Sequence, residues 1–277
     1  MRLSKRSRIF TYLILSLGAL LILFPIYITL ATTFKTASES SVSFFTLPKS
    51  LYLGNYLSVL QDQKLYYAYG NTLLITAVSL VGELILLPPM GYALSRSMGR
   101  SRVFRGLYFF FLMGIFLPWQ VRMMPVVKLM SWLNLLSPLG VTLLYMAHAT
   151  CESMFLYVGY LATVSTTIEE AAYIDGASTF QIYSRVILPL MTPILSTVVI
   201  REGLAIWNDF QLPLITLNRS SKLWTLTIYL NNFSSEYSVD YNSAFACLVL
   251  TCLPIVILYI IMQKQIMGGL TSGAIKG

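Results

Sequence analysis

Charged residues are scarce in this chain of 277 residues. Asp, Glu, Lys and Arg together make up 11% of the sequence, whereas apolar residues make up 56%. A soluble domain carries about 25% charged residues, so a water-soluble fold of this size would lack the polar surface that it needs. The mean hydropathy of +0.71 points the same way. The composition therefore predicts an integral membrane protein and excludes a disordered chain.

Histidine and cysteine are also rare. His148 is the single histidine, and the three cysteines, Cys151, Cys247 and Cys252, lie inside apolar runs. His148 and Glu152 are four residues apart on one helix face, but two ligands do not complete a metal site. We expect no metal site and no disulfide framework, and we expect the cysteines to pack as small apolar residues.

Motifs for nucleotide binding and covalent catalysis are missing as well. The sequence contains neither the glycine-rich phosphate loop that ends in Gly-Lys-Ser/Thr nor the Gly-x-Ser-x-Gly turn that carries a nucleophilic serine. The chain is therefore expected to be no enzyme and to bind no cofactor of its own. Nucleic acid is not an expected partner, because no segment outside the membrane is large enough for a binding domain.

Long apolar runs, by contrast, are plentiful. A helix needs about 20 mostly apolar residues to cross the hydrocarbon core of a bilayer. The expected fold class is all-α: one polytopic membrane domain over residues 1–277 with six transmembrane helices. These spans are predicted at about 9–34, 67–94, 106–126, 139–164, 186–206 and 241–262. Glu83 and the Pro88-Pro89 pair interrupt the second apolar run.

The basic residues indicate how the spans are oriented. Of the 19 Lys and Arg residues, 11 fall on the side of the two termini, and seven are spread over the longer loops of the opposite side. The side that is richer in Lys and Arg is usually cytoplasmic. Both termini and the loop 165–185 are therefore expected in the cytoplasm, with the segments 35–65 and 207–240 outside.

The loop 165–185 has a strongly patterned sequence. Thr166 stands three residues before Glu169, and Ser178 three residues before Gln181, which is the spacing of a capping box at the start of a helix. Thr167 and Glu170 offer the same spacing as an alternative. Gly176 stands where a left-handed residue would end the first helix. The pattern predicts two short helices with a tight turn between them, with small residues suited to close docking against another protein.

This loop also carries a family resemblance. Glu170-Ala171-Ala172, then Gly176 and Val186-Ile187-Leu188-Pro189, resemble the EAA signature of permease subunits in binding-protein-dependent ABC importers. The stretch from Glu169 to Ser178 is similar to the carbohydrate branch. Further similar segments are Asn55-Tyr56, Asn71-Thr72, Gly91-Tyr92-Ala93-Leu94, Trp207-Asn208-Asp209-Phe210, Pro213-Leu214 and the tail 269–277, which resembles the maltose-type second permease subunit. Ser165 stands where the family usually has proline, and we expect it to act as a cap.

The resemblance implies the type I ABC importer permease fold in a bacterial or archaeal cytoplasmic membrane. It implies a heterodimer with a second permease subunit, two ATPase subunits that bind the ATP, an extracytoplasmic solute-binding protein and a surrounding lipid bilayer. The residues that it assigns to coupling with the ATPase are Glu169, Glu170, Ala171, Ala172, Asp175, Gly176 and Ala177.

Ionisable residues inside predicted spans are costly, and they either pair between helices or line a pathway. Glu83, Glu152, Arg201 and Glu202 are of this kind. Arg201 and Glu202 are adjacent, about 100° apart on a helix, so each is expected to pair with another span. Sugars are commonly held by aromatic stacking and hydrogen bonds. The residues predicted to line the substrate pathway are Glu152, Tyr145, Trp207 and Asn208, with Tyr157 as a further possibility.

The expected substrate is a di- or oligosaccharide. A glycerol-phosphate or polyol-type ABC permease is the alternative, since permeases for such substrates share these motifs. Only Arg201 would offer a positive charge within a span to an anionic substrate, which favours a neutral sugar. A stand-alone secondary transporter would need repeated halves with broken helices, and a scaffolding protein would not need the patterned loop 165–185.

Overall fold

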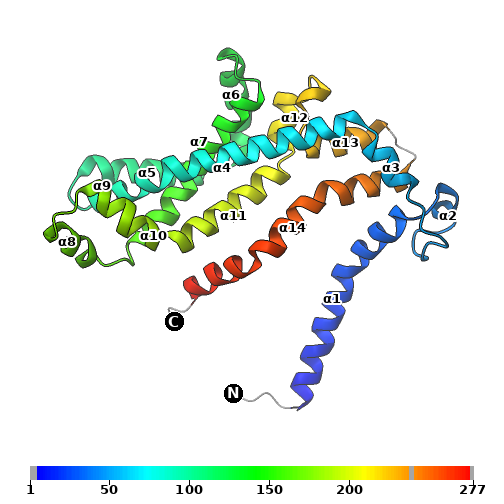
Figure 1. Ribbon diagram of the computed structural model, residues 1–277, viewed down its shortest axis with the longest axis horizontal. Coiled ribbons are helices and arrows are strands. Elements are labelled where there is room, and N and C mark those ends of the chain that lie inside the picture. Colours follow the sequence, from blue (N-terminus) through cyan, green and yellow to red (C-terminus); the bar gives the residue numbers. More distant parts are fainter. Residues whose placement is uncertain (1–4, 237–239, 275–277) are drawn as a thin grey trace. The chain divides into compact units, whose positions relative to one another are not determined.

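The computed structural model describes the backbone of residues 5–236 and 240–274 and the side chains of 8–233, 240–257, 260 and 263. The described residues form helices and no strand (Figure 1), which confirms the all-α prediction. The end of the family-like tail, residues 275–277, lies outside the described residues, as do the side chains of Arg2, Lys264 and Lys276, on which the orientation depends in part.

The described chain forms two compact units, residues 1–66 with 229–254 and residues 67–228 with 255–277. Three helices, α4 (Gln63–Ser97), α13 (Leu226–Glu236) and α14 (Tyr241–Ala274), run from one unit into the other. A single domain over 1–277 stays a prediction.

The first unit joins α1 (Lys5–Thr33), α2 (Ala37–Val42) and α3 (Gly54–Leu60) to the start of α14. Carbonyl groups at the C-terminal end of a helix have no partner within it, and here two side-chain amides supply donors. Asn55 Nδ2 donates to Thr33 O and Lys35 O, both at 2.8 Å. Asn242 Nδ2 donates to Thr32 O at 3.1 Å and to Lys35 O at 2.8 Å. The two amides therefore hold the end of α1 against α3 and α14.

The second unit is built around α7 (Pro138–Leu161), which packs against α5 (Arg102–Ile115), α11 (Thr192–Asn208) and α12 (Gln211–Leu217). Figure 1 shows α6 (Trp119–Trp132) and α12 at one end of this unit and α8 (Thr167–Ile174) and α9 (Thr179–Ile182) at the other. The remaining elements are a π-helical turn η1 (Tyr183–Ile187), α10 (Leu188–Leu190), a 3-10 turn η2 (Ser221–Leu223) and α13 (Leu226–Glu236), which continues into the first unit.

Two buried clusters hold the second unit together. The first surrounds Tyr157, Leu161 and Ile187, which are 0% exposed, and extends to Leu87 of α4. The second surrounds Val141, Leu212 and Leu217. The helices α4 and α7 approach closely at Gly91. A Cβ atom added there would lie only 2.7 Å from Tyr157 Cβ. Glycine is therefore required at this crossing.

Some of the predicted spans are continuous helices and others are broken or bent. Arg8–Thr33 and Gln63–Ser97 are long and apolar enough to cross a membrane, and α4 continues through Pro88 and Pro89 without a break. The predicted third span, 106–126, is broken: α5 and α6 meet at an angle of 106°. Pro118, which precedes α6, lacks the N–H that a continuing helix would need.

The predicted fifth span, 186–206, is also bent, by 69° between Leu190 and Thr192. Counting each bent pair as one span gives up to four spans among the described residues, with Tyr241–Ile257 as a shorter apolar helix. The helix α7, 24 residues long, occupies the place of the predicted fourth span but is not among the four. Six spans stay a prediction.

Candidate functional site

The loop 165–185 folds into two short helices with a tight turn, as predicted. Gly176 has φ +82°, so it ends α8 in the left-handed conformation. The N–H of Ala177 reaches back to Ala172 O at 3.0 Å, which closes the turn. The capping box at α9 is also confirmed: Gln181 N–H donates to Ser178 Oγ at 3.4 Å, and Ser178 N–H donates to Gln181 Oε1 at 2.8 Å.

The capping box predicted for α8 is wrong. Thr166 has a helical backbone and makes no side-chain cap, and Thr167 is already the first residue of the helix. Ser165 Oγ accepts from the Thr167 N–H at 3.3 Å, which is the capping role that we expected of this serine. The Glu169 carboxylate does not turn back to the start of α8, because partners on α4 bind both of its oxygens.

These partners are Arg96 and Tyr92. Arg96 Nε donates to Glu169 Oε1 at 2.7 Å, and Arg96 Nη2 lies at the same distance from that oxygen. The Tyr92 hydroxyl donates to Glu169 Oε2 at 2.8 Å. Both charged side chains are largely buried, at 19% exposure for Arg96 and 13% for Glu169. The ion pair therefore joins α8 to the end of α4.

The other residues assigned to coupling divide between the surface and the interior of the second unit. Glu170, Ala171, Asp175 and Gly176 are exposed, whereas Ala172 and Ala177 are half-buried against the first core cluster. Four large apolar residues of this loop are exposed without having been predicted as contact residues: Ile168, Tyr173, Ile174 and Phe180, at 44%, 72%, 84% and 75%. We call these four residues the exposed apolar set.

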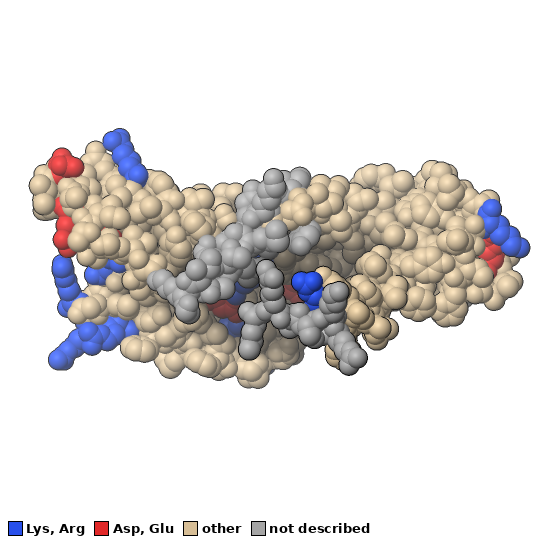
Figure 2. Space-filling model, turned by 90° about the horizontal axis from the view of Figure 1, so that it is seen from below, with Lys and Arg blue, Asp and Glu red and all other residues tan. Residues whose placement is uncertain are grey.

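Charged side chains of both signs gather at this end of the second unit. Figure 2 shows blue and red atoms around the part that carries α8 and α9. The exposed apolar set thus lies among charged side chains, and exposed apolar residues rimmed by polar ones are typical of a surface that another protein covers.

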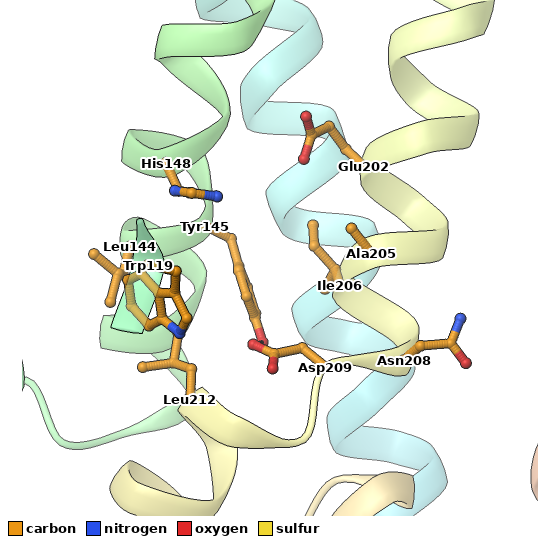
Figure 3. A pocket seen from close by; sticks show the side chains of 10 residues that line it. All are labelled: Trp119, Leu144, Tyr145, His148, Glu202, Ala205, Ile206, Asn208, Asp209 and Leu212. Carbon is orange, nitrogen blue, oxygen red and sulfur yellow. Dashed lines mark hydrogen bonds between the residues drawn. The ribbon is translucent and has the colours of Figure 1, made fainter. Parts of the chain in front are cut away.

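At the opposite end of the second unit lies a pocket of about 310 Å³. Its lining comes from α6, α7, α11 and the start of α12 (Figure 3) and consists of Trp119, Leu144, Tyr145, His148, Glu202, Ala205, Ile206, Asn208, Asp209 and Leu212. The volume lies at the lower end of the range for small-molecule sites. The lining combines three aromatic rings with two carboxylates, which suits hydrogen-bonding ligands that also have apolar faces.

Hydrogen bonds fix the polar groups of this pocket. The Tyr145 hydroxyl donates to Asp209 Oδ2 at 2.8 Å, and Asp209 Oδ1 accepts from the Gln211 N–H at 2.9 Å. Arg122 Nη2 lies 2.9 Å from His148 Nδ1, and its guanidinium lies 5.8 Å from the centre of the Trp119 ring. The Arg122 guanidinium therefore contacts two of the aromatic rings that line the pocket, those of His148 and Trp119.

Arg201 is the centre of a charged group inside the second unit. It forms ion pairs with Glu152 of α7 and with its neighbour Glu202. The expectation that each of the two residues pairs with another span is confirmed for Arg201, which binds Glu152, and is wrong for Glu202, because the long arginine side chain lets the guanidinium reach both carboxylates. Glu83 is 2% exposed, and neither of its carboxylate oxygens has a hydrogen-bond partner among the described residues.

The predicted pathway residues separate in the structure. Tyr145 and Asn208 line the pocket, whereas Glu152 and Trp207 are not lining residues. The amide of Asn208 donates to Leu204 O of its own helix at 2.8 Å and points away from Tyr145 (Figure 3). Trp119 and Asp209 also line the pocket and were not predicted. Asp209 stands within the family-like string Trp207-Asn208-Asp209-Phe210, which could have identified it.

No group of three His, Cys, Asp or Glu residues is placed to bind a metal ion within the part of the chain that the structure describes.

Comparisons with known proteins agree with this architecture. The family model for the binding-protein-dependent transport system inner membrane component matches residues 88–269. The multiple sugar-binding transport system permease protein MsmG of Streptococcus mutans is 37% identical over 266 residues, which cover 96% of each chain. The probable starch degradation products transport system permease protein AmyC of Thermoanaerobacterium thermosulfurigenes is 35% identical over 268 residues, 96% of this chain and 97% of AmyC.

A solved structure is similar as well. A chain from the crystal structure of a bacterial ABC transporter involved in the import of the acidic polysaccharide alginate superposes with a TM-score of 0.83 and 26% identity, covering 95% of this chain and 99% of that one. The chain therefore belongs to the family of inner membrane components of binding-protein-dependent transport systems, as a multi-pass permease subunit of an ABC importer.

Proposed function

We propose that this permease subunit carries neutral oligosaccharides into the cell as one half of a heterodimeric pathway. A second permease subunit forms the other half, two ATPase subunits bind to the cytoplasmic side, and a solute-binding protein delivers the sugar from outside. Both termini and the loop 165–185 lie in the cytoplasm in this proposal, in keeping with the distribution of basic residues.

The exposed apolar set of the loop 165–185 is the observation that carries the ATPase coupling. Tyr173, Ile174 and Phe180 are each more than 70% exposed, on two short helices held in place by Gly176 and by the α9 capping box. Aromatic and apolar side chains that are exposed on a rigid support are typical centres of protein interfaces. Glu170 and Asp175, exposed beside them, offer carboxylates to basic groups on the ATPase.

The pocket supports a neutral sugar as the substrate. Trp119 and Tyr145 offer ring faces, and the carboxylates of Asp209 and Glu202 accept hydrogen bonds from hydroxyl groups. Arg201 balances the charge of Glu202 and Arg122 lies behind Trp119, so charges of both signs surround the pocket and neither sign dominates, which suits a neutral sugar. The names of MsmG and AmyC, multiple sugars and starch degradation products, support the same substrate class.

Reconstitution tests the proposal. The chain, its partner permease, the ATPase and the binding protein are placed in liposomes, and ATP hydrolysis and uptake are measured with neutral oligosaccharides, an oligouronate and glycerol 3-phosphate. We expect neutral oligosaccharides alone to stimulate both activities. Uptake without the ATPase would contradict the coupling, and preferred uptake of an anionic substrate would contradict the assignment to neutral sugars.

Pocket variants sharpen this test. Trp119→Ala and Asp209→Asn should reduce uptake while leaving the assembled complex intact, because each removes one polar or aromatic contact from the pocket lining. The matched control is Trp132→Ala, since this tryptophan also lies on α6 but is 79% exposed and does not line the pocket. Equal uptake by the pocket variants and the control would place the sugar elsewhere.

A further inference from the structure

A single guanidinium on α4 binds three segments of the second unit. Arg96 pairs with Glu169 of α8 through Nε and Nη2, at 2.7 Å in each case. Its Nη1 donates to Leu161 O at 3.0 Å, and its Nη2 also donates to Val164 O at 3.2 Å. Leu161 is the last residue of α7, and Val164 lies between α7 and α8. Arg96 thus reaches the end of α7, the connection that follows it and α8 itself.

These contacts are stronger than an ordinary surface ion pair. The guanidinium is planar and presents its donors in a fixed fork, so several acceptors can be bound at once only in one arrangement. The pair is largely buried, at 19% exposure for Arg96 and 13% for Glu169, and hydrogen bonds between charged groups gain strength away from water. Arg96 also gives the carbonyl of Leu161, which accepts from the Val164 N–H at 3.2 Å, a second donor.

Tyr92 extends the contact to the other side of the loop. Its hydroxyl donates to the second oxygen of Glu169 at 2.8 Å. Its ring lies 5.5 Å from the ring of Tyr183 in η1, the turn that follows α9. Both ends of the α8–α9 segment are therefore fixed to the last two turns of α4.

Both carboxylate oxygens of Glu169 are therefore already bound within the chain, which leaves few acceptor positions for a partner protein. One carboxylate oxygen is bound by Arg96 and the other by Tyr92, whereas the adjacent Glu170 is exposed. The two neighbouring glutamates thus face in different directions: Glu170 toward the surface and Glu169 toward α4.

We propose that Arg96, Glu169 and Tyr92 form a rigid joint through which movement of α8 on the ATPase is transmitted to α4 and α7. Glu169 is a positioning residue in this joint and does not bind the ATPase. A loose connection would let α8 follow the ATPase while the membrane helices stay in place. The joint instead makes α8 and the ends of both long helices move as one body. This inference rests on the proposed coupling to an ATPase.

Amide exchange in the full reconstituted complex tests the joint itself. Glu169→Gln and Arg96→Ala should raise the exchange rate of the α8 amides about tenfold, the order expected when a hydrogen bond to a charged group is lost. The matched control is Arg100→Ala, which removes the same charge from the exposed turn just after α4. Unchanged α8 exchange in both joint variants would overturn the proposal.

Coupling is the second measurement. Arg96→Glu and Glu169→Arg should each lower the sugar transported per ATP hydrolysed about tenfold, while the KM for ATP and the amount of copurified ATPase stay as in the wild type. The double variant restores the opposite charges and should regain part of the transport ratio, because the carbonyl contacts of Arg96 are not restored. Transport ratios at the wild-type level in both single variants, or no gain in the double variant, would refute the joint.

Two near-isosteric variants keep the test decisive if charge reversal lowers the amount of complex. Tyr92→Phe and Glu169→Gln retain the side-chain shapes, and both should reduce the transport ratio with normal assembly. Failure of the proposed function has a different outcome: no sugar-loaded binding protein would then stimulate ATP hydrolysis by the wild-type complex. The α8 exchange rates would still report on the joint in that case.

Discussion

Replacing Gly176 by alanine should loosen the turn between α8 and α9 by an amount that the backbone alone determines. Gly176 has φ +82°, where a residue with a Cβ atom costs about 1–2 kcal/mol. No atom lies within 4 Å of a Cβ built at this position, so no steric clash adds to that cost within the chain. A loss of this size changes an opening equilibrium by a factor of about 5–30.

The amide of Ala177 reports this change directly. Its hydrogen bond to Ala172 O, at 3.0 Å, exists only when the turn is closed. Its exchange rate in Gly176→Ala should therefore rise by the same factor of about 5–30. Gly176→Asn should show a smaller rise, since asparagine tolerates the left-handed region better than alanine does. Gly159→Ala is the control, because Gly159 lies in α7 with equally open surroundings and no positive φ.

Gly176→Leu separates backbone strain from docking. Alanine and leucine have the same backbone cost at this φ, and their Cβ atoms meet the same open space, so both variants should show similar exchange in the chain without ATPase. In the complete complex, only leucine adds bulk at the surface that we propose to be covered, and it should bind the ATPase more weakly than alanine does. Wild-type exchange in Gly176→Ala would refute the backbone argument, and equal ATPase binding by both variants would refute the docking at this position.

Three further predictions concern buried or bound polar groups. Arg201→Ala should destabilise the permease by about 3 kcal/mol, because Glu202, 6% exposed, loses its partner; Glu83→Gln removes no such partner and should leave the thermal stability nearly unchanged. Asn242→Ala should lower the stability of the first unit by about 2 kcal/mol, since the carbonyls of Thr32 and Lys35 lose a donor, and proteolysis near residue 35 should accelerate. Hydrogen bonds from the N–H groups of Thr36 and Lys49 lower the pKa of Glu39 below its ordinary value of 4.5. The stabilisation that Glu39 provides is therefore complete above that value and is lost as the pH falls through the folded pKa. Amide exchange over 36–49 should rise on acidification in the wild type but not in Glu39→Gln.

Features that depend on neighbouring residues could be predicted from the sequence. The left-handed Gly176 and the Ser178–Gln181 capping box are confirmed, because each follows from the chemistry of a few adjacent residues. The all-α class follows from the apolar runs, and the pocket residue Tyr145 was also predicted to line the pathway.

Features that depend on distant residues could not be predicted. The Thr166–Glu169 capping box fails because Arg96, 73 positions away, binds the carboxylate more strongly than a backbone N–H would. The approach of Trp119 to His148, and of Asp209 to Tyr145, depends on how α6 and α12 fold back on α7. The pattern of apolar residues does not reveal the bend between α5 and α6 at Pro118, so it could not predict these contacts.

The exposed apolar set has a consequence for how the importer is made. In the proposed topology, a newly inserted chain would present Tyr173, Ile174 and Phe180 to the cytosol until an ATPase subunit covered them. Surfaces of this kind bind chaperones and attract proteases, so an excess of the permease over the ATPase should be degraded. Balanced synthesis of the subunits would then be a requirement built into α8 and α9. Cells that produce this chain without its ATPase should accumulate less of it.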